Sequence, residues 1–164
     1  MDLKKNESIQ RVYKTLKKYD ENQSLIILET SAGTAKDAAT SLGCNVGAIV
    51  KSLIFKSNDK YYLCLISGDK RASASKIKSI LNVDELSMAS ATDVKQVTGF
   101  SIGGVSPIGH LNKLNVLIDL SLGRFNQLFA AAGHPYCIFK INYRDLIKIT
   151  NGLPNNITEW DNQI

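Results

Sequence analysis

The sequence predicts a mixed α/β fold, in which a mixed sheet or barrel is flanked by helices. Three observations lead to this prediction. The chain has 164 residues, a length that suits one domain with a sizeable core. Its hydrophobic residues make up 44% and its charged residues 21% of the chain, as in ordinary globular proteins. Helical and strand patterns interleave without the regular strand–helix–strand rhythm of a Rossmann fold, so a doubly wound parallel sheet is less favoured.

The N-terminal part of the chain is predicted to contain two helices and a strand. Across residues 8–19 the apolar side chains recur at helical spacing and lysines occupy the other face. A short apolar strand follows at 25–28. Thr34 and Asp37 then form a capping box, and the helix that they open is expected to end at Gly43.

A β-hairpin is predicted next. Residues 48–56 and 61–66 are rich in β-branched, aromatic and other apolar side chains, and turn-forming residues separate them. Further elements are expected as helices at 73–81, 91–97 and 143–149, strands at 114–120 and 137–141, and a weakly favoured strand at 125–132. The chain is therefore divided into an N-terminal amphipathic helix over 1–22, a folded domain over 23–152 and a loose polar tail over 153–164.

Charge and hydropathy narrow the possible partners. Lys and Arg outnumber Asp and Glu by 20 to 15, and the excess lies in the first 20 residues and between Lys51 and Lys78. Such a segment beside a site would favour a polyanion such as nucleic acid, although solvated lysines on helix faces are the simpler interpretation. The longest apolar run, Tyr61–Ile66, is far shorter than the roughly 20 residues of a membrane helix. The Lys-rich start does not match a secretory signal, so a cytoplasmic protein without a membrane partner is expected.

The three cysteines, Cys44, Cys64 and Cys137, lack C-x-x-C spacing and lie in or beside apolar stretches. They are expected to be reduced core thiols. A cysteine nucleophile assisted by His110 or His134 is less favoured, because no neighbour in the sequence would lower a thiol pKa. No metal site and no cofactor are predicted.

Lys51 interrupts an otherwise apolar strand at 48–55. A lysine in that setting either extends its side chain outward to solvent or points into a polar cavity. In a cavity, its ammonium could hold a phosphate or a developing oxyanion. The strand pattern alone favours neither alternative.

A glycine-rich loop at 102–110 contains three glycines and Pro107. Glycine lets the main chain approach a ligand closely, while the proline fixes its own φ and biases Ser106 to extended geometry. The loop could therefore present backbone N–H and C=O groups to an amine, a carbonyl oxygen or a water. The alternative is an ordinary tight connection. The loop has neither the P-loop spacing nor the dinucleotide-binding spacing.

Two polar residues near this loop have open roles. His110 could act as an acid or base or as a hydrogen-bonding clamp, and the structural role is the more common one. Asp119 ends an apolar run, where a carboxylate needs a partner, so it could pair with Lys51 or cap the next turn. Ser106 and Ser121 have no nucleophile-elbow context, which disfavours a covalent serine mechanism.

Several segments occur in an order that is known from one family. They are Thr34–Ala39, Leu42-Gly43, Ile49–Phe55, Gly68–Arg71, Lys76, Thr98–His110 and Ile118-Asp119. Together they resemble the YbaK/ProX family of freestanding aminoacyl-tRNA deacylases, relatives of the editing domain in bacterial prolyl-tRNA synthetase. The most specific elements are the strand Lys51 and the Gly104–Pro107 segment, which matches the family's Gly-x-x-Pro motif.

The resemblance implies a mixed, barrel-like sheet with surrounding helices and a trans-editing activity. This activity would hydrolyse the ester between a wrong, small amino acid and tRNA, without a metal or a covalent intermediate. Lys51 would bind the terminal phosphate or orient the ester. The implied catalytic residues are Lys51, Gly104 and His110; the substrate-binding residues are Thr34, Gly103, Val105, Ser106, Pro107 and Asp119; the tRNA-binding residues are Arg71 and Lys76. The implied partners are the acceptor end of a mischarged tRNA and, beside it, an aminoacyl-tRNA synthetase.

One segment departs from the family pattern. Residues 109–113 read Gly-His-Leu-Asn-Lys, where the YbaK branch has a Gly-Gln-Lys-Lys-like segment, which argues against a YbaK-like preference for Cys-tRNA. Alanine, serine, threonine, cysteine or another amino acid with a small side chain all remain open as the edited amino acid. Two other classes compete with the enzyme: an inactive adaptor that binds tRNA or a synthetase, and a binding protein for a nucleotide or small metabolite. Lys51 together with the complete loop favours the enzyme.

Overall fold

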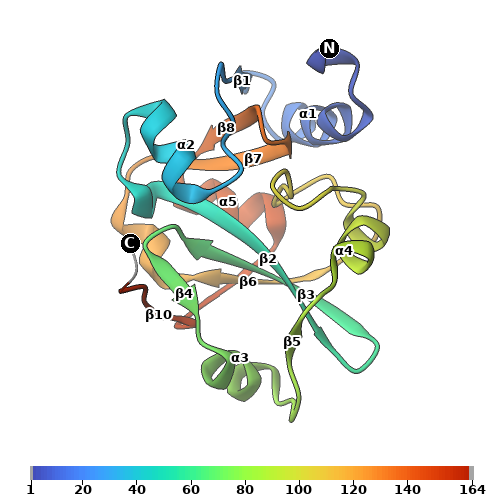
Figure 1. Cartoon of the computed structure of the whole chain (residues 1–164), viewed down its shortest axis with the longest axis vertical. Helices are drawn as coiled ribbons and strands as arrows, with labels where there is room; N and C mark the ends of the chain where they lie inside the picture. The colour runs from blue at the N-terminus through green and yellow to red at the C-terminus, as the bar shows by residue number, and fades with distance from the viewer. Residues whose placement is uncertain (1, 163–164) are drawn as a thin grey trace.

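The computed structural model describes residues 2–162 of the chain. Within that range the chain forms five α-helices, and Figure 1 shows the helices arranged around a sheet. The α-helices are α1 (Glu7–Tyr19), α2 (Ala35–Leu42), α3 (Ala74–Leu81), α4 (Ala91–Thr98) and α5 (Tyr143–Thr150). The strands are β1 (Leu25–Ile27), β2 (Ile49–Ser57), β3 (Lys60–Ser67), β4 (Lys70–Ala72), β5 (Ser87–Met88), β6 (Asn115–Asp119), β7 (Leu128–His134), β8 (Cys137–Ile141), β9 (Leu153–Asn155) and β10 (Thr158–Trp160). Short 3-10 helices lie at Leu3–Lys5, Val46–Ala48 and Leu120–Arg124.

The main sheet has eight strands and is mixed, as predicted. Its order is β1-β8-β7-β2-β3-β6-β9, and β5 pairs with β2 beside this path. The pairs β2–β7, β3–β6 and β6–β9 are parallel, and the remaining pairs of this sheet are antiparallel. β10 and β4 form a separate antiparallel pair.

Local sequence signals fix the helix ends where they were predicted. The Thr34 hydroxyl accepts a hydrogen bond from the Asp37 N–H at 3.1 Å and starts α2. Gly43 ends this helix in the left-handed region with φ at 66°. The serines Ser73 and Ser90 start α3 and α4 in the same way. In each of these caps the side chain accepts from the N–H three residues further along the chain. Such a local contact can be predicted from the sequence pattern alone.

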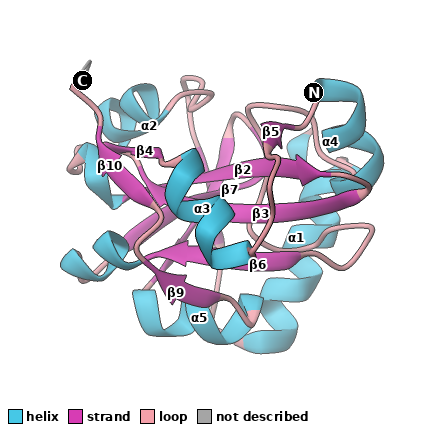
Figure 2. Ribbon diagram, turned by 90° about the horizontal axis from the view of Figure 1, so that it is seen from below, coloured by secondary structure: helices cyan, strands magenta, loops and turns pink. Residues whose placement is uncertain are grey.

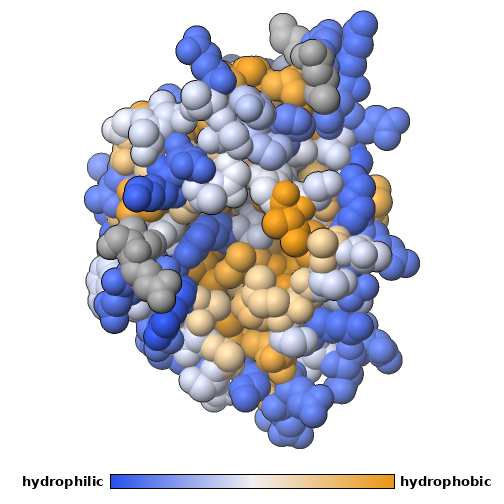
Figure 3. Space-filling model, viewed as in Figure 1, coloured by the Kyte–Doolittle hydropathy of each residue, from blue (hydrophilic) through white to orange (hydrophobic). Residues whose placement is uncertain are grey.

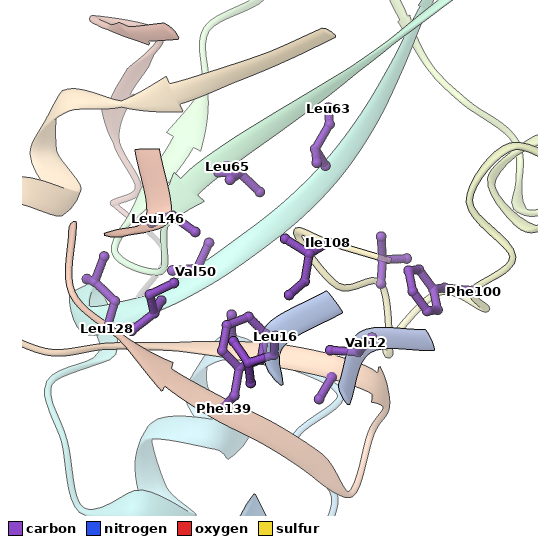
Figure 4. Close-up of a cluster of buried hydrophobic side chains, with 14 of the residues drawn as sticks. Val12, Leu16, Val50, Leu63, Leu65, Phe100, Ile108, Leu128, Phe139 and Leu146 are labelled. Carbon is purple, nitrogen blue, oxygen red and sulfur yellow. The ribbon is translucent and has the colours of Figure 1, made fainter. Parts of the chain in front are cut away.

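The sheet separates two larger hydrophobic cores, because successive side chains of a strand point to opposite faces, and a third, small cluster lies under α2 around Ala38, Ala39 and Ile49. On β3, Leu63 and Leu65 belong to the larger core, while Cys64 and Ile66 belong to the smaller one. Helices α1 and α5 cover the larger core, which Figure 4 shows between the strands and the loop after α4. Helix α3 covers the smaller core through Ile77 and lies across β2 and β3 in Figure 2.

Helix α1 is an integral part of the larger core. Ile9, Val12 and Leu16 are at most 2% exposed and pack with residues of β7 and β8. The amphipathic pattern of 8–19 therefore places its apolar face on the sheet, and the helix does not form a unit apart from the domain. Met1 lies outside the described residues.

The expectation of a loose C-terminal tail is wrong for residues 153–160. β9 adds to β6 at the edge of the main sheet, and β10 pairs with β4. Between them, Ile157 is fully buried in the smaller core. The segment is polar overall, but backbone pairing and one apolar anchor are enough to order it. Residues 163–164 of the predicted tail lie outside the described part of the chain.

Candidate active site

A cavity of about 340 Å³ opens beside the middle of β2. Its walls come from α2 and the segment before it, from β2, β7 and β8, from the segment containing Met88 and Ala89, and from the glycine-rich loop. Small and aliphatic side chains dominate these walls. In Figure 3 the corresponding face is hollowed, with hydrophobic side chains along its lower wall and hydrophilic side chains to its left. The volume lies at the lower end of the range typical of small-ligand sites, roughly 300–1,000 Å³.

The cavity exists because one edge of β2 is not fully paired. β7 pairs with Ile49 and Val50, and β5 pairs with Phe55 and Lys56. Residues 51–54, which we call the open edge of β2, have no register partner on that side within residues 2–162. Side chains from both faces of β2 line the cavity for this reason.

The open edge presents main-chain hydrogen-bonding groups to the cavity. In an antiparallel pair, the backbone groups of successive residues alternate between facing the partner strand and facing away. The Ile54 carbonyl faces away from β3, since it accepts a hydrogen bond from the Ala89 N–H at 2.9 Å. Ser52, two residues earlier, therefore directs its N–H and C=O to the same side. Its buried Oγ also has no hydrogen-bond partner among the described residues.

Lys51 lies in the wall of this cavity, whose lining is mostly apolar, whereas the predicted alternative was a polar cavity. On its face of β2, Ile49 packs under α2 and Phe55 packs in the core covered by α3, so Lys51 lies between the two covered regions. Its Nζ donates a hydrogen bond to the Lys70 carbonyl. Burial lowers the pKa of Lys51, and the carboxylates of Asp161, Asp69 and Asp119 act in the opposite direction.

Three other predicted site residues also line the cavity: Thr34, Gly103 and Val105. Gly103 has φ at 96°, a conformation that favours glycine, and brings the loop near the Cα of Gly33. Within residues 2–162, the N–H groups of Gly103 and Val105 donate to no protein acceptor. The loop therefore brings two unpaired main-chain donors to the same cavity as Lys51.

Gly104, Ser106 and Pro107 belong to the buried part of the loop, not to the cavity wall. The Gly104 N–H donates to the Ser101 carbonyl at 3.0 Å. A Cβ on Gly104 would lie 2.8 Å from the His134 nitrogen. The close approach that requires glycine here is thus to the β7–β8 turn and not to a ligand.

His110 is a structural clamp, the more common of its two predicted roles. Its Nε2 lies 2.7 Å from the Ser106 carbonyl oxygen, which can only accept, so Nε2 carries the proton. Its ring meets Phe100 edge-on, with ring centroids 5.8 Å apart. Burial lowers the pKa of His110, the Arg11 charge lowers it further, and the hydrogen bond to Ser106 opposes both. His110 is absent from the described cavity lining, so the structure does not support a catalytic role.

Asp119 caps the next turn, one of its two predicted alternatives. Its carboxylate accepts from the N–H and hydroxyl of Ser121 at 2.9 and 2.7 Å. It also accepts from the Ser67 N–H at 3.1 Å and the Thr158 hydroxyl at 3.2 Å. The residue is 1% exposed and its oxygens are fully used by these donors, so substrate binding by Asp119 is not supported.

The two residues predicted to bind tRNA already have protein partners. Arg71 forms an exposed ion pair with Glu159 at 2.9 Å. The Lys76 Nζ donates to the Thr158 carbonyl at 2.6 Å and to the Asn156 side chain at 3.3 Å. Both lie near β10, outside the cavity lining, and both tie the C-terminal strand to the domain.

All three cysteines are free thiols: Cys64 and Cys137 are buried, as predicted, whereas Cys44 is only half-buried. Burial raises the pKa of Cys64 to about 12 and that of Cys137 to about 11, and it also raises the pKa of Cys44.

Residues 2–162 contain no cluster of three or more His, Cys, Asp or Glu side chains that could share a metal ion. None of the helices in this range has the length and apolar character that a membrane crossing requires.

Sequence reasoning did not identify Ser52, Ala35 or Ala38 as part of the site. Ser52 follows Lys51 directly, so a polar residue in the same apolar strand was a usable signal. Ala35 and Ala38 read as ordinary helix residues, and no local pattern shows that they face a cavity.

Comparison with known proteins places this geometry in a family. The chain belongs to the aminoacyl-tRNA editing domain family, whose model matches residues 29–149. Over 130 residues it is 31% identical to a proline–tRNA ligase of Caldicellulosiruptor bescii, a match that covers 78% of this chain and 22% of the ligase. It is 32% identical over 119 residues to the uncharacterised Bacillus subtilis protein YwhH, covering 72% of this chain and 75% of YwhH.

A solved structure shows the same fold at nearly full length. It is a protein proposed to be a trans-editing enzyme for prolyl-tRNA synthetase, with 33% identity and a TM-score of 0.88. The match covers 94% of this chain and 98% of that chain. The predicted family and fold are confirmed, and a tRNA-editing function is supported. The chain spans about a fifth of the length of the matched ligase.

Proposed function

We propose that the protein is an aminoacyl-tRNA deacylase, which hydrolyses in trans the ester bond of a tRNA charged with a wrong, small amino acid. One observation carries this proposal: Lys51, Ser52, Gly103 and Val105 line one small, mostly apolar cavity, and the N–H groups of Gly103 and Val105 have no protein acceptor within residues 2–162. Family membership supports the tRNA part of the substrate.

The walls of the cavity favour a small side chain on the amino acid. Ala32, Ala35 and Ala38 form one wall and Ile49 and Leu53 contribute to the floor. These side chains offer apolar contact without a charged partner, so a short aliphatic group is the best match. The main-chain groups then remain for the ammonium, the carbonyl and the attacking water.

The reaction needs positioning and charge stabilisation. Water adds to the ester carbonyl carbon, and negative charge develops on the carbonyl oxygen. The bond to the ribose oxygen then breaks, this oxygen takes a proton that the water supplied, and free amino acid and uncharged tRNA leave. Fixed N–H donors and a nearby cation lower the energy of such an oxyanion. The neighbouring ribose hydroxyl of the tRNA would help to orient the water.

No cysteine is placed to act as a nucleophile in this reaction. Cys64 and Cys137 are fully buried, and their raised pKa values keep them as thiols at neutral pH. None of the three cysteines, including the half-buried Cys44, lines the cavity. We therefore propose water as the attacking group.

A second candidate function is an inactive adaptor that binds charged tRNA or a synthetase. One observation favours it: among the described residues that line the cavity, Lys51 is the only ionisable side chain. A cavity without a side-chain base depends wholly on positioning and on the substrate, and such a site could retain binding without turnover.

A deacylation assay separates the two functions. The purified protein is incubated with tRNAs charged with Ala, Ser, Thr, Cys or Pro, and release of free amino acid is followed with time. Lys51→Ala should abolish release, because it removes the cation from the cavity. Lys56→Ala is the matched control, since this lysine of the same strand pairs with Asp93 at 3.7 Å outside the cavity. Release by the wild type and by Lys56→Ala, without release by Lys51→Ala, would establish the enzyme. Equal release by Lys51→Ala would refute the role of Lys51, and binding of charged tRNA without any release would favour the adaptor.

A further inference from the structure

The C-terminal strand carries an exposed aromatic residue that the proposed chemistry does not use. Trp160 ends β10 and is 58% exposed, although it is a large apolar side chain. The Lys70 Nζ lies 3.5 Å from the centroid of its ring. The Arg124 Cζ lies 5.3 Å from the same centroid. An exposed indole flanked by two cations is the pattern of single-stranded nucleic-acid sites, where bases stack on aromatic rings beside positive charge.

The two cations differ in how far they are already neutralised. Arg124 is held by Asp69, with its Nη2 2.7 Å from the carboxylate, and it also packs on Phe125. Lys70 forms no ion pair within residues 2–162. Arg124 therefore supports the ring, whereas the Lys70 ammonium is available to a phosphate.

Trp160 is coupled to the cavity through a single residue. Lys70 stands opposite Trp160 in the β4–β10 register, and its carbonyl accepts the hydrogen bond from Lys51. The same residue thus holds the cavity lysine with its main chain and contacts the indole with its side chain. Figure 1 shows β4 and β10 side by side, next to the end of β2 that precedes the open edge.

We infer that Trp160 and Lys70 form a binding site for the unpaired 3′ end of a tRNA. This inference rests on the proposed function, because the terminal aminoacylated nucleotide is placed in the cavity. A base that precedes this nucleotide stacks on the Trp160 indole in place of the Lys70 ammonium, which turns from the ring to the intervening phosphate. This assignment differs from the sequence prediction, which selected Arg71 and Lys76, both of which have protein partners.

Trp160 is the only tryptophan of the chain, so its fluorescence reports directly on this site. Uncharged tRNA is titrated into the wild-type protein, and the same tRNA without its last three nucleotides serves as the comparison. The intact tRNA should quench the fluorescence in a saturable way, and the shortened tRNA should not. Because neither tRNA is charged, the result does not depend on hydrolysis.

Variant binding is measured in parallel by anisotropy of labelled tRNA. Trp160→Ala should raise the Kd for intact tRNA about tenfold, the loss expected for one stacked base, and leave the Kd for shortened tRNA unchanged. Trp160→Phe should recover most of the affinity, because it retains a stacking surface. Tyr13→Ala is the matched control, since this exposed ring also lies near a lysine, with Lys17 Nζ 5.4 Å from its centroid.

The outcomes separate this site from the proposed activity. A wild-type Kd for Trp160→Ala, or an equal loss on both tRNAs, would overturn the Trp160 site even if charged tRNA is hydrolysed. Quenching by intact tRNA together with a selective loss in Trp160→Ala would establish the site even if no amino acid is released. Absence of tRNA binding by wild-type protein would overturn both.

Discussion

Gly104 provides a direct test of how the glycine-rich loop is held. The substitution Gly104→Ala adds one methyl group at a position where the ideal Cβ would lie 2.8 Å from the His134 nitrogen and 2.9 Å from the His134 Cα. It would also lie 3.0 Å from the Gly133 carbonyl carbon. All three neighbours are backbone atoms, so no side chain can rotate away to make room.

The magnitude follows from how far the chain must move. Carbon atoms in contact prefer about 3.5–4.0 Å, so the two segments must separate by roughly 0.5–1 Å. The β7–β8 turn cannot retreat toward α1, because Gly133 itself packs against the backbone of Ser8. Overpacking of this kind costs about 1–3 kcal/mol, and the lower entropy of alanine in the unfolded chain returns about 0.4–1 kcal/mol. We expect a net loss of about 1–2 kcal/mol, which corresponds to a Tm lower by roughly 2–8 °C.

Thermal unfolding followed by circular dichroism measures this loss. Gly33→Ala is the control, because a Cβ there would meet only the Ser31 Oγ at 3.4 Å. Its Tm should equal that of the wild type or lie slightly above it. A Tm of Gly104→Ala within about 1 °C of the wild type would refute the explanation that backbone packing fixes this glycine.

Two further substitutions test the structural roles of His110 and α1. Burial lowers the pKa of His110 below 6.5, so the unfolded chain binds the proton first as pH falls. Stability is then lost below that pH by at most about 1.4 kcal/mol per pH unit. The fall in urea midpoint between about pH 7.5 and about pH 5.5 should therefore be smaller in His110→Gln than in the wild type, and an equal fall would contradict a buried neutral imidazole. Leu16→Ala should cost about 2–5 kcal/mol in urea unfolding, because this side chain is fully buried. Exposed Lys14→Ala should change stability by less than about 0.5 kcal/mol, and a similar small effect of Leu16→Ala would show that α1 does not belong to the core.

The parts of the fold that the sequence predicts are those with local causes. The N-cap at Thr34 and the stop at Gly43 depend on residues a few positions apart, and both were predictable. The β2–β3 hairpin follows from two apolar runs and a turn, in which Asn58 adopts a positive φ of 54°. Even Lys51 could be singled out, because a charged residue inside an apolar strand is conspicuous without knowledge of the fold.

The remaining parts depend on contacts between distant segments. Asp119 was left between two roles, since its partners Ser67 and Thr158 lie 52 and 39 residues away. β10 was missed for the same reason: its order comes from pairing with β4, not from its own hydropathy. The open edge of β2 depends on where β7 and β5 stop pairing, and no pattern within β2 indicates those points.

The open edge of β2 separates the atoms that hold a ligand from those that select it. In the proposed function, a ligand at this edge would take the place of an absent strand and bond to the main-chain N–H and C=O of Ser52, which every substitution except proline leaves in place. The side chains of Ala35, Ala38 and Leu53 set how much room the ligand's own side chain has. If the proposed function holds, changes in these walls would therefore alter which amino acid is accepted, while its anchoring would stay the same. A site built in this way could acquire a new specificity and still bind the part of the substrate that all aminoacyl groups share.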